Sequence, residues 1–483
     1  MKFLKLAACI TSASLLIACG DDDSNSSSVP AINMEKAQLV VNTNADIAYA
    51  TYTDSVETAK ALKAALATFK ASPTEENLTA AKTAWLVSRE PYGQTEVYRF
   101  RNSPVDALDV EGDLNAWPLG EALIDYVNTG NDGDDFDNDQ IGVTAHGFGD
   151  DITATIDVTN AEASNTIIGN TDIAIDNTLL AKGLAAEDEH DVISGYHAIE
   201  FLLWGQDLNT ADQSTTDGTD RDEAVNATSA GGQRPVTDFQ PGITAAYDEN
   251  ELSHRRHMYL EIAVDKLIAD LEAVQAEWAT GDEDNYRASF TSLADAADAK
   301  TKLTEILNGM GTLSEGELAG ERMQIAFATN SQEDEHSCFS DNTHRDIWLN
   351  AEGVSNSFYG SYAGYDSDLN GSDDITTNAV DGYGISDYLT DVGLTTVVTE
   401  TTAALTATQA GYTAIDSSAR AGSPFDVLIQ NPTEDSSVAV TIKALNAQSR
   451  LIQDAADKLG LGTVVEGDAS GCDTENPTSS EGC

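Results

Sequence analysis

The sequence predicts an all-α protein of two packed helical-bundle halves with acidic loop insertions. Long segments repeat apolar residues at every third and fourth position, and helix-starting and helix-ending residues bracket them. Stretches rich in Gly, Thr and Asp separate these segments. The chain has 483 residues, which is enough for two cores of ordinary size. We therefore expect an N-terminal helical half over residues 33–215 and a C-terminal helical half over residues 236–462.

The first 19 residues have the pattern of a bacterial lipoprotein signal peptide. Lys2 and Lys5 precede an apolar stretch that ends in Leu-Ile-Ala-Cys at Cys19, where cleavage would leave a lipid on the new N-terminus. Residues 20–32 then read as a flexible tether. We expect a periplasm-facing lipoprotein of the bacterial cell envelope, and the absence of aspartate directly after Cys19 favours the outer membrane.

Acidic residues dominate the composition. Aspartate and glutamate number 82 against 25 lysines and arginines, which gives a net charge of −57. Such a chain repels phosphate backbones, so a nucleic-acid partner is excluded. The charge suits cations, and it equally suits solubility in a salty medium.

The N-terminal half begins with an amphipathic helix over residues 33–70. Residues 72–75, Ser-Pro-Thr-Glu, read as a capping box with proline at the first helical position, so a second helix starts there and runs towards Phe100. Pro91 and Gly93 predict a kink in it. A short helix from Gly120 to Asn128 and a loop with a hairpin around residues 152–158 should follow.

The C-terminal half should contain further helices, ending in one over residues 436–459 that Gly460 stops. The others are expected over about 253–280, 285–308, 316–346 and 385–414. Residues 463–483 read as a tail. Its Cys472 and Cys483 could close a small loop in an oxidising compartment, which would leave Cys338 single and buried.

His197 and Glu200 are the first candidate site residues. Three positions apart on a helix, they share one face and can converge on one atom, and His190 falls close to the same direction. Apolar residues occupy the rest of the circumference, so an ionisable pair here needs a proton, a partner or a metal. A structural hydrogen bond is the plain alternative to a metal site.

A second polar pattern lies in residues 332–346. Read as a helix, it places Glu333, Asp341 and His344 within an arc of about 80°, and His336 about 60° beyond Glu333. Such a seam could face another polar seam in a bundle core. The alternative is a helix whose acidic face is simply exposed to solvent.

These motifs resemble those of a known family. The stretch Gly195–Asp207, which reads Gly-Tyr-His-Ala-Ile-Glu-Phe-Leu-Leu-Trp-Gly-Gln-Asp, looks like the signature of the imelysin family, also called M75 or insulin-cleaving membrane protease. Residues 332–346 resemble the stretch that marks its iron-regulated protein A-like branch. A helix carrying Trp85, Arg89 and Tyr92 before a Pro-Val-Asp turn at residues 104–106 is a third match, and the resemblance covers about residues 33–460.

The resemblance implies a metal site between the two halves. In related iron-uptake members, a glutamate and an aspartate join the histidine and glutamate of the signature at the metal. The matching residues here are Glu96 and Asp106, so the implied ligands are His197, Glu200, Glu96 and Asp106. A further family glutamate falls at Gly93, where this chain departs from the pattern. The residues expected beside the metal or at a second site are Arg89, His190, Glu333, His336, Asp341 and His344.

The leading hypothesis is a lipid-anchored metal-binding protein linked to iron acquisition or iron-regulated homeostasis. Its partners would be a metal ion or chelate, the membrane through the lipid, and an iron-uptake protein. One imidazole with several carboxylates suits iron, with zinc or calcium left open. A metallopeptidase using the same site is the first alternative, although the chain lacks the His-Glu-x-x-His pattern in which a base lies between two ligands. A structural or partner-binding lipoprotein without metal is the second.

Overall fold

The structure, a computed structural model, describes residues 29–100, 103–117, 119–125, 166–180, 192–207, 231–242, 251–332, 334–430, 432–465 and 471–483. Within these ranges the chain is all-α apart from one short β-hairpin, so the predicted fold class is confirmed. The predicted signal peptide with Cys19, the residues His190 and Glu333, and the hairpin near residue 155 lie outside the described ranges.

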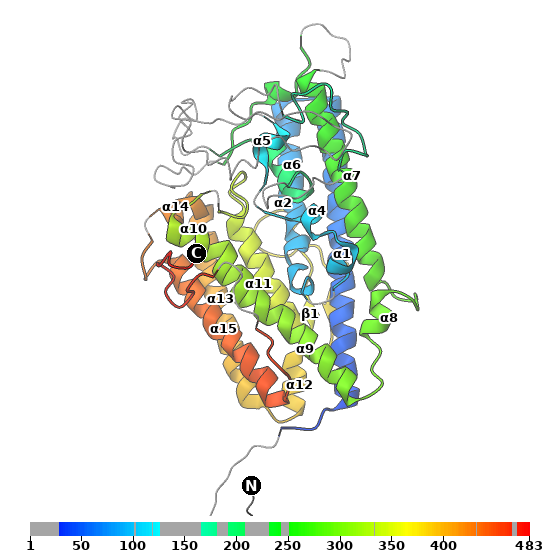
Figure 1. Cartoon of the computed structure of the whole chain (residues 1–483), viewed down its shortest axis with the longest axis vertical. Helices are drawn as coiled ribbons and strands as arrows, with labels where there is room; N and C mark the ends of the chain where they lie inside the picture. Colours follow the sequence, from blue (N-terminus) through cyan, green and yellow to red (C-terminus); the bar gives the residue numbers. More distant parts are fainter. Residues whose placement is uncertain are drawn as a thin grey trace, which may run out of the picture.

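The first bundle consists of four helices around a shared apolar core (Figure 1). They are α1 (Met34–Ala71), α2 (Glu75–Gly93), α6 (Gly195–Trp204) and α7 (Leu252–Trp278). The long helix α1 packs against α2 and α7, and α6 packs against α2 and α7. Thus α7, which follows the expected boundary between the two halves, packs with helices of the first half.

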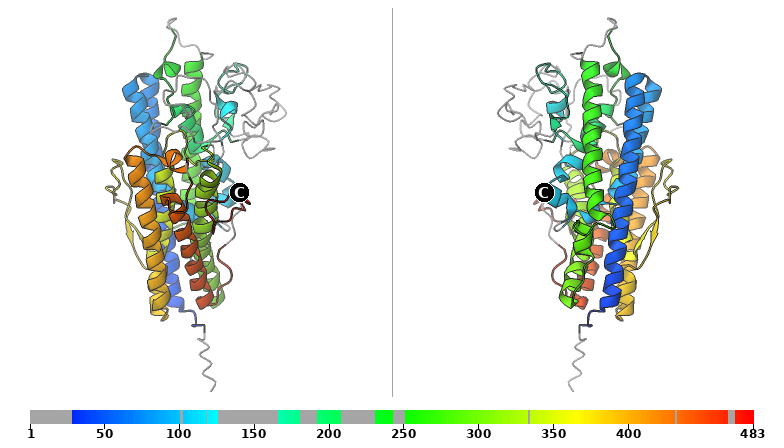
Figure 2. Two further views of the ribbon diagram at one scale, coloured as in Figure 1. Left: turned by 90° about the vertical axis from the view of Figure 1, so that its left-hand side faces the viewer. Right: turned by 90° about the vertical axis from the view of Figure 1, so that its right-hand side faces the viewer.

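The second bundle is built around α15 (Ser437–Leu459), which contacts α13 (Thr395–Arg420) and α9 (Ala296–Thr312). From α9 the chain continues through a π-helical segment, η6 (Leu313–Gln324), into α10 (Ile325–Thr329). The helix α11 (Thr343–Tyr359) contacts α13 of this bundle and α2 of the first, so it joins the two bundles. The side views show that the bundles lie along one elongated body (Figure 2).

Short elements fill the connections. The two-residue strands β1 (Ser361–Tyr362) and β2 (Val380–Asp381) pair antiparallel, with Ser361 opposite Asp381 and Tyr362 opposite Val380. The other short elements are η1 (Glu96–Tyr98), α3 (Pro104–Leu108), α4 (Glu111–Leu114), α5 (Glu121–Ile124), η5 (Val236–Phe239), α8 (Tyr286–Phe290), α12 (Ile385–Asp391) and α14 (Phe425–Ile429).

Two predicted helix boundaries need correction. The second helix starts at Glu75, after Thr74, whose side chain accepts a hydrogen bond from Asn77 N, so Pro73 lies outside the helix. The predicted helix over 316–346 is wrong. It ends at Asn330, which has a left-handed φ of 59°, and the next helix begins only at Thr343. The connection, residues 330–342, is called the 330s loop below.

The last helix ends as expected, because Gly460 adopts the left-handed conformation (φ 66°) that suits glycine. The expected disulfide between Cys472 and Cys483 is confirmed, and Cys338 is buried. The segment that this disulfide closes is held to the second bundle, because the Gln324 side-chain amide donates to the carbonyl oxygens of Asp473, Asn476 and Ser479. None of the described helices is long and apolar enough to cross a membrane.

Candidate metal centre

The helix α6 holds His197 and Glu200 in the interior, where neither side chain has exposed surface. The helix starts at Gly195, whose φ of +82° and close approach to the backbone of Leu114 exclude a side chain: a Cβ there would lie 2.5 Å from the Leu114 oxygen. All ten residues of α6 are buried. The position of the pair is therefore fixed by packing on every side.

The two side chains are hydrogen-bonded to each other, with His197 Nδ1 2.8 Å from Glu200 Oε2. The other oxygen of Glu200 accepts from the backbone N of Ser340 at 3.0 Å and from the Ser340 hydroxyl at 2.6 Å. Both carboxylate oxygens are thus engaged, whereas the second ring nitrogen of His197, Nε2, is buried and has no hydrogen-bond partner. A buried polar atom without a partner is costly, and a lone pair on Nε2 is a ligand atom for a metal.

Burial favours the uncharged form of both members of the pair. It raises the pKa of Glu200 to about 8, despite the bonds from Ser340. Burial also lowers the pKa of His197 well below its ordinary value, and the charges of Arg89 and Arg322 lower it further. The His197 ring is therefore neutral at physiological pH, and a metal at Nε2 would require the tautomer that donates its Nδ1 proton to an ionised Glu200.

A second imidazole lies against the first. The ring centroids of His197 and His336 are 4.9 Å apart, and Trp117 packs edge-on against His197 at the same distance. Burial lowers the pKa of His336 well below its ordinary value as well. Its Nε2 lies 3.4 Å from the side-chain nitrogen of Asn115. The sequence predicted His336 near the site, and the structure brings the two rings together.

A buried ion pair continues this polar network towards α11. Arg89, on α2, donates through Nε to Asp346 at 2.9 Å and through a terminal nitrogen to the Asn115 oxygen at 2.5 Å. The second oxygen of Asp346 accepts from the Ser337 hydroxyl at 2.5 Å. Arg89 thus neutralises Asp346 and orients Asn115 beside His336, so it supports the centre from α2.

The two other residues implied as ligands are engaged in different ways. Glu96 is buried but paired, with Oε2 2.8 Å from Arg322 and 3.8 Å from Arg99. Burial alone would raise the pKa of Glu96, but the charges of Arg322 and Arg99 outweigh it and hold this pKa below its ordinary value. Asp106 is exposed, and its carboxylate closes the cap of α3 by accepting from the backbone N of Ser103. The structure therefore does not bring Asp106 to the buried pair.

The departure from the family pattern at Gly93 has a steric reason. A Cβ at this position would lie 2.6 Å from the Cβ of Leu349 on α11. A Cβ at Gly353, one turn further along α11, would lie 2.7 Å from the backbone oxygen of Gln94. The contact between α2 and α11 thus leaves no room for a glutamate side chain at position 93.

The remaining predicted residues belong to the 330s loop and the start of α11. His344 Nδ1 lies 2.9 Å from the Asp341 backbone oxygen, and its Nε2 lies 3.7 Å from Asp416. The Asp341 side chain points away from this ring into a group of buried acids with Asp207, Glu335 and Asp426. We call these four residues the acid cluster.

Sequence reasoning missed several contributors. Asn115 and Ser340 hold His336 and Glu200, but a single Asn or Ser in a loop carries no spacing signal. Asp207 closes the imelysin-like signature and could have been singled out on that ground. Asp426 lies on a five-residue helix with no motif around it, and nothing in the sequence marks it.

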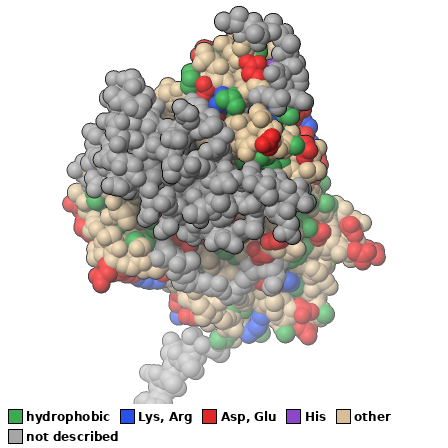
Figure 3. Space-filling view, turned by 45° about the horizontal axis from the view of Figure 1, so that its top comes forward, with side chains coloured by type: hydrophobic (Ala, Val, Ile, Leu, Met, Phe, Trp, Pro, Cys, Tyr) green, Lys and Arg blue, Asp and Glu red, His purple; other side chains and the backbone are tan. Residues whose placement is uncertain are grey.

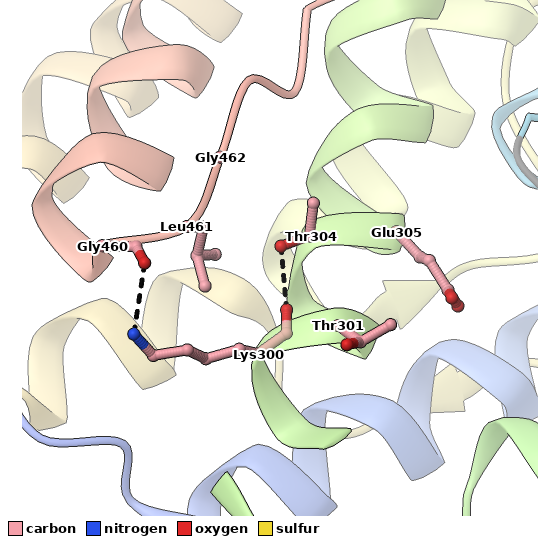
Figure 4. Close-up of a pocket in the computed structure, with 7 residues that line it drawn as sticks. All are labelled: Lys300, Thr301, Thr304, Glu305, Gly460, Leu461 and Gly462. Carbon is pink, nitrogen blue, oxygen red and sulfur yellow. Dashed lines mark hydrogen bonds between the residues drawn. The ribbon is translucent and has the colours of Figure 1, made fainter. Parts of the chain in front are cut away.

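Among the described residues, the exterior offers no comparable set of ligands. A surface hollow between α9 and the residues after α15 is lined by two ionisable side chains, Lys300 and Glu305, and Lys300 donates to the Gly460 oxygen at 3.2 Å (Figure 4). Over the described part of the face in Figure 3, acidic side chains are scattered rather than gathered at one hollow. The buried centre is therefore the stronger candidate.

The fold and the centre define an all-α, two-bundle protein with a buried histidine–glutamate pair on an internal helix. The family model for imelysin (peptidase M75) matches residues 48–452, so the chain belongs to the imelysin family, and the resemblance seen in its motifs is confirmed. Over 58 residues the chain is 40% identical to iron-regulated protein A of Synechococcus elongatus, a match that spans 12% of this chain and 16% of that relative.

Two crystal structures have a similar fold. One is an iron-regulated protein A precursor from Parabacteroides distasonis, 16% identical, with a TM-score of 0.56 over 89% of this chain and 96% of that chain. The other is an imelysin-like protein from Psychrobacter arcticum, 13% identical, with a TM-score of 0.53 over 90% of this chain and 98% of that chain. At these identities the likeness establishes the fold.

Proposed function

We propose that this protein binds a metal ion, iron in the first place, through His197 in the bacterial cell envelope. The observation that carries the proposal is the buried Nε2 of His197, which has no partner although the opposite nitrogen is held by Glu200. A carboxylate that fixes one nitrogen of a histidine while the other faces a metal is a recurring arrangement in metalloproteins.

The residues present fit a metal with imidazole ligands. His197 would bind through Nε2, and the ring of His336, 4.9 Å away between centroids, is the neighbouring imidazole that could supply a second nitrogen. Glu200 would accept a hydrogen bond from His197 Nδ1 and hold the ring in place, because both its oxygens are already engaged. Glu96 and Asp106 take no part in this proposal. Imidazole nitrogen suits iron, zinc and copper, and the metal would act here as cargo or as a structural ion.

The link to iron rests on the family and on the names of its members. The relative in Synechococcus and one of the two similar structures are described as iron-regulated proteins. Attachment to the membrane rests on the lipoprotein pattern that ends at Cys19. Replacing Cys19 with alanine should release the protein from the membrane fraction and abolish labelling with a radioactive fatty acid.

The metal proposal can be tested by titrating Fe²⁺ into metal-free protein in a calorimeter without oxygen. We expect His197→Phe, which keeps a ring in place, to lose Fe²⁺ binding, and Glu200→Gln to weaken it by about 10-fold to 100-fold. The matched control is His257→Phe. His257 is also buried, but its Nε2 lies 3.1 Å from the Phe239 oxygen, so this variant should bind like the wild type.

Two outcomes would change the assignment. Equal Fe²⁺ affinity in wild type and His197→Phe would refute the proposed ligand. Cleavage of a peptide library by the metal-loaded wild type, lost in His197→Phe, would support the peptidase alternative. The elemental content of protein purified without chelators then identifies the metal that is bound in the cell.

A further inference from the structure

The acid cluster brings carboxylates from three separate parts of the chain to one point. Asp207 follows the end of α6, Asp341 lies in the 330s loop, and Asp426 lies on α14. One oxygen from each lies within 4.8 Å of the others. Asp207 and Asp426 are buried, and Asp341 is partly so.

The carboxylate of Asp426 has no cationic partner among the described residues, and only the nearby backbone N–H groups of Asp426 and Val427 offset its burial. The residue has no exposed surface, and neither oxygen has a partner in hydrogen-bond geometry. One oxygen of Asp341 is likewise buried without a partner. An uncompensated buried carboxylate is among the costliest arrangements in a folded protein, so the position of Asp426 calls for a ligand.

Glu335 provides a second and independent indication. It has no exposed surface, and neither oxygen has a partner in hydrogen-bond geometry, although the nearby Thr343 side chain favours its ionised form. The negative charges that act on it are those of Asp426, Asp341 and Asp207, so it lies within electrostatic range of the same three carboxylates. Four acids therefore share one interior region.

Several other buried acids of this protein are compensated within the fold. Asp346 is paired with Arg89, Glu90 with Arg345, and Asp125 with both Arg234 and Arg256. Asp54 has no arginine, but its two oxygens accept hydrogen bonds from the Tyr362 hydroxyl and the Asn378 amide. For the side-chain oxygens of Asp426 and Glu335 the described residues supply neither an arginine nor a partner in hydrogen-bond geometry.

We propose that Asp207, Asp341, Asp426 and Glu335 form a second cation site, selective for a hard divalent cation of the Ca²⁺ class. A set of carboxylate oxygens without nitrogen or sulfur favours such cations. The three aspartate oxygens lie within 4.8 Å of one another, so one such ion can reach all of them.

This site is distinct from the histidine centre. Glu200 is bound to His197 and Ser340, whereas Asp341, the next residue of the loop, contributes to the acid cluster. The proposal does not rest on iron binding at His197, because its ligands and its preferred cation are different.

The test is a Ca²⁺ titration of the full chain at pH 7.5, after removal of metals with a chelator, followed by calorimetry and thermal unfolding. We expect Ca²⁺ to bind the wild type and to raise its Tm. Asp426→Asn keeps the shape of the side chain and should weaken Ca²⁺ binding by about 10-fold or more, with loss of the Tm shift. The control Asp435→Asn removes the same charge from an exposed residue and should bind Ca²⁺ like the wild type.

The outcomes separate the two sites. His197→Phe should keep Ca²⁺ binding, and Asp426→Asn should keep Fe²⁺ binding. Absence of a Ca²⁺-dependent heat and Tm shift in the folded wild type at millimolar Ca²⁺ would overturn the proposal, and the cluster would then be a set of acids kept neutral by protons. Equal Ca²⁺ affinity in Asp426→Asn and wild type would overturn the ligand set.

Discussion

The histidine centre and the acid cluster both contact the 330s loop, but they differ in whether their buried carboxylates have hydrogen-bond partners. At the histidine centre, Glu200 makes three hydrogen bonds, and only the neutral Nε2 of His197 lacks a partner. In the acid cluster, Asp426 and Glu335 lack partners at every side-chain oxygen. The first arrangement presents one oriented nitrogen, and the second presents several negative oxygens.

The difference shows how a fold can offer two kinds of ligand at short range. A single imidazole lone pair selects borderline metals such as iron or zinc, whereas a group of carboxylates selects hard cations. The ion pair between Arg89 and Asp346 supplies a third case, in which a buried acid is neutralised within the protein. Neutralising the paired acid Asp346 should therefore lower the free energy of unfolding, whereas neutralising the unpaired acid Asp426 should raise it.

The largest effect is expected where the buried acid is paired. Asp346→Asn would leave the Arg89 guanidinium buried without its counter-charge and should lower the free energy of unfolding by about 3–5 kcal/mol. Denaturant unfolding followed by circular dichroism measures this. The exposed control Asp435→Asn should change the value by less than about 0.5 kcal/mol. If Asp346→Asn lowered the free energy of unfolding by less than about 1 kcal/mol, the Arg89–Asp346 ion pair would not be the strong stabilising contact inferred here.

The unpaired acids should give the opposite sign and a dependence on pH. Burial raises the pKa of Asp426 from 3.8 to about 7. The folded protein then retains a proton that the unfolded chain has lost, so this group destabilises the fold progressively as pH rises from about 4 to 7. With a chelator present, the free energy of unfolding of Asp426→Asn should equal that of the wild type at pH 5 or exceed it slightly. At pH 8 it should exceed the wild-type value by on the order of 2 kcal/mol. A constant difference across this range would contradict the account.

A smaller effect is expected at the bond between the 330s loop and the histidine centre. Ser340→Ala removes the hydroxyl that donates to Glu200 and leaves the bond from the backbone N. The free energy of unfolding should fall by about 1 kcal/mol, and Fe²⁺ affinity by up to ~10-fold as His197 loses part of its support. Ser340→Thr retains the hydroxyl and should restore the affinity. If Ser340→Thr did not restore the Fe²⁺ affinity, the Ser340 hydroxyl would have no role in metal binding.

Much of the fold could be predicted because its signals are local. The apolar repeat of α1 and the glycine after α15 gave those helices nearly to the residue. The sequence predicts a helix for the 330s loop because its polar residues fit a helical arc, and nothing in the sequence shows that Asn330 adopts a left-handed φ. In the structure, buried side-chain hydrogen bonds such as that from Ser337 to Asp346 take the place of the backbone hydrogen bonds of a helix.

The site was predictable only in its local part. His197 and Glu200 lie three residues apart on one helix, so their contact follows from geometry. Glu96 and Asp106 were carried over from relatives, but the placement of Arg322 beside Glu96 depends on the packing of η6 against η1 and could not be read from either segment. The three aspartates of the acid cluster come from parts of the chain more than 80 positions apart, and such meetings have no sequence signature.

The 330s loop has one further consequence. Ser340 holds Glu200 beneath His197, and Asp341, in a left-handed conformation with φ 58°, turns its carboxylate into the acid cluster. Consecutive residues on so constrained a turn cannot move independently. Occupancy of either cation site would therefore alter the affinity of the other by one common factor, as thermodynamic linkage requires. With both proposed ions bound, this turn would transmit the occupancy of one site to the other.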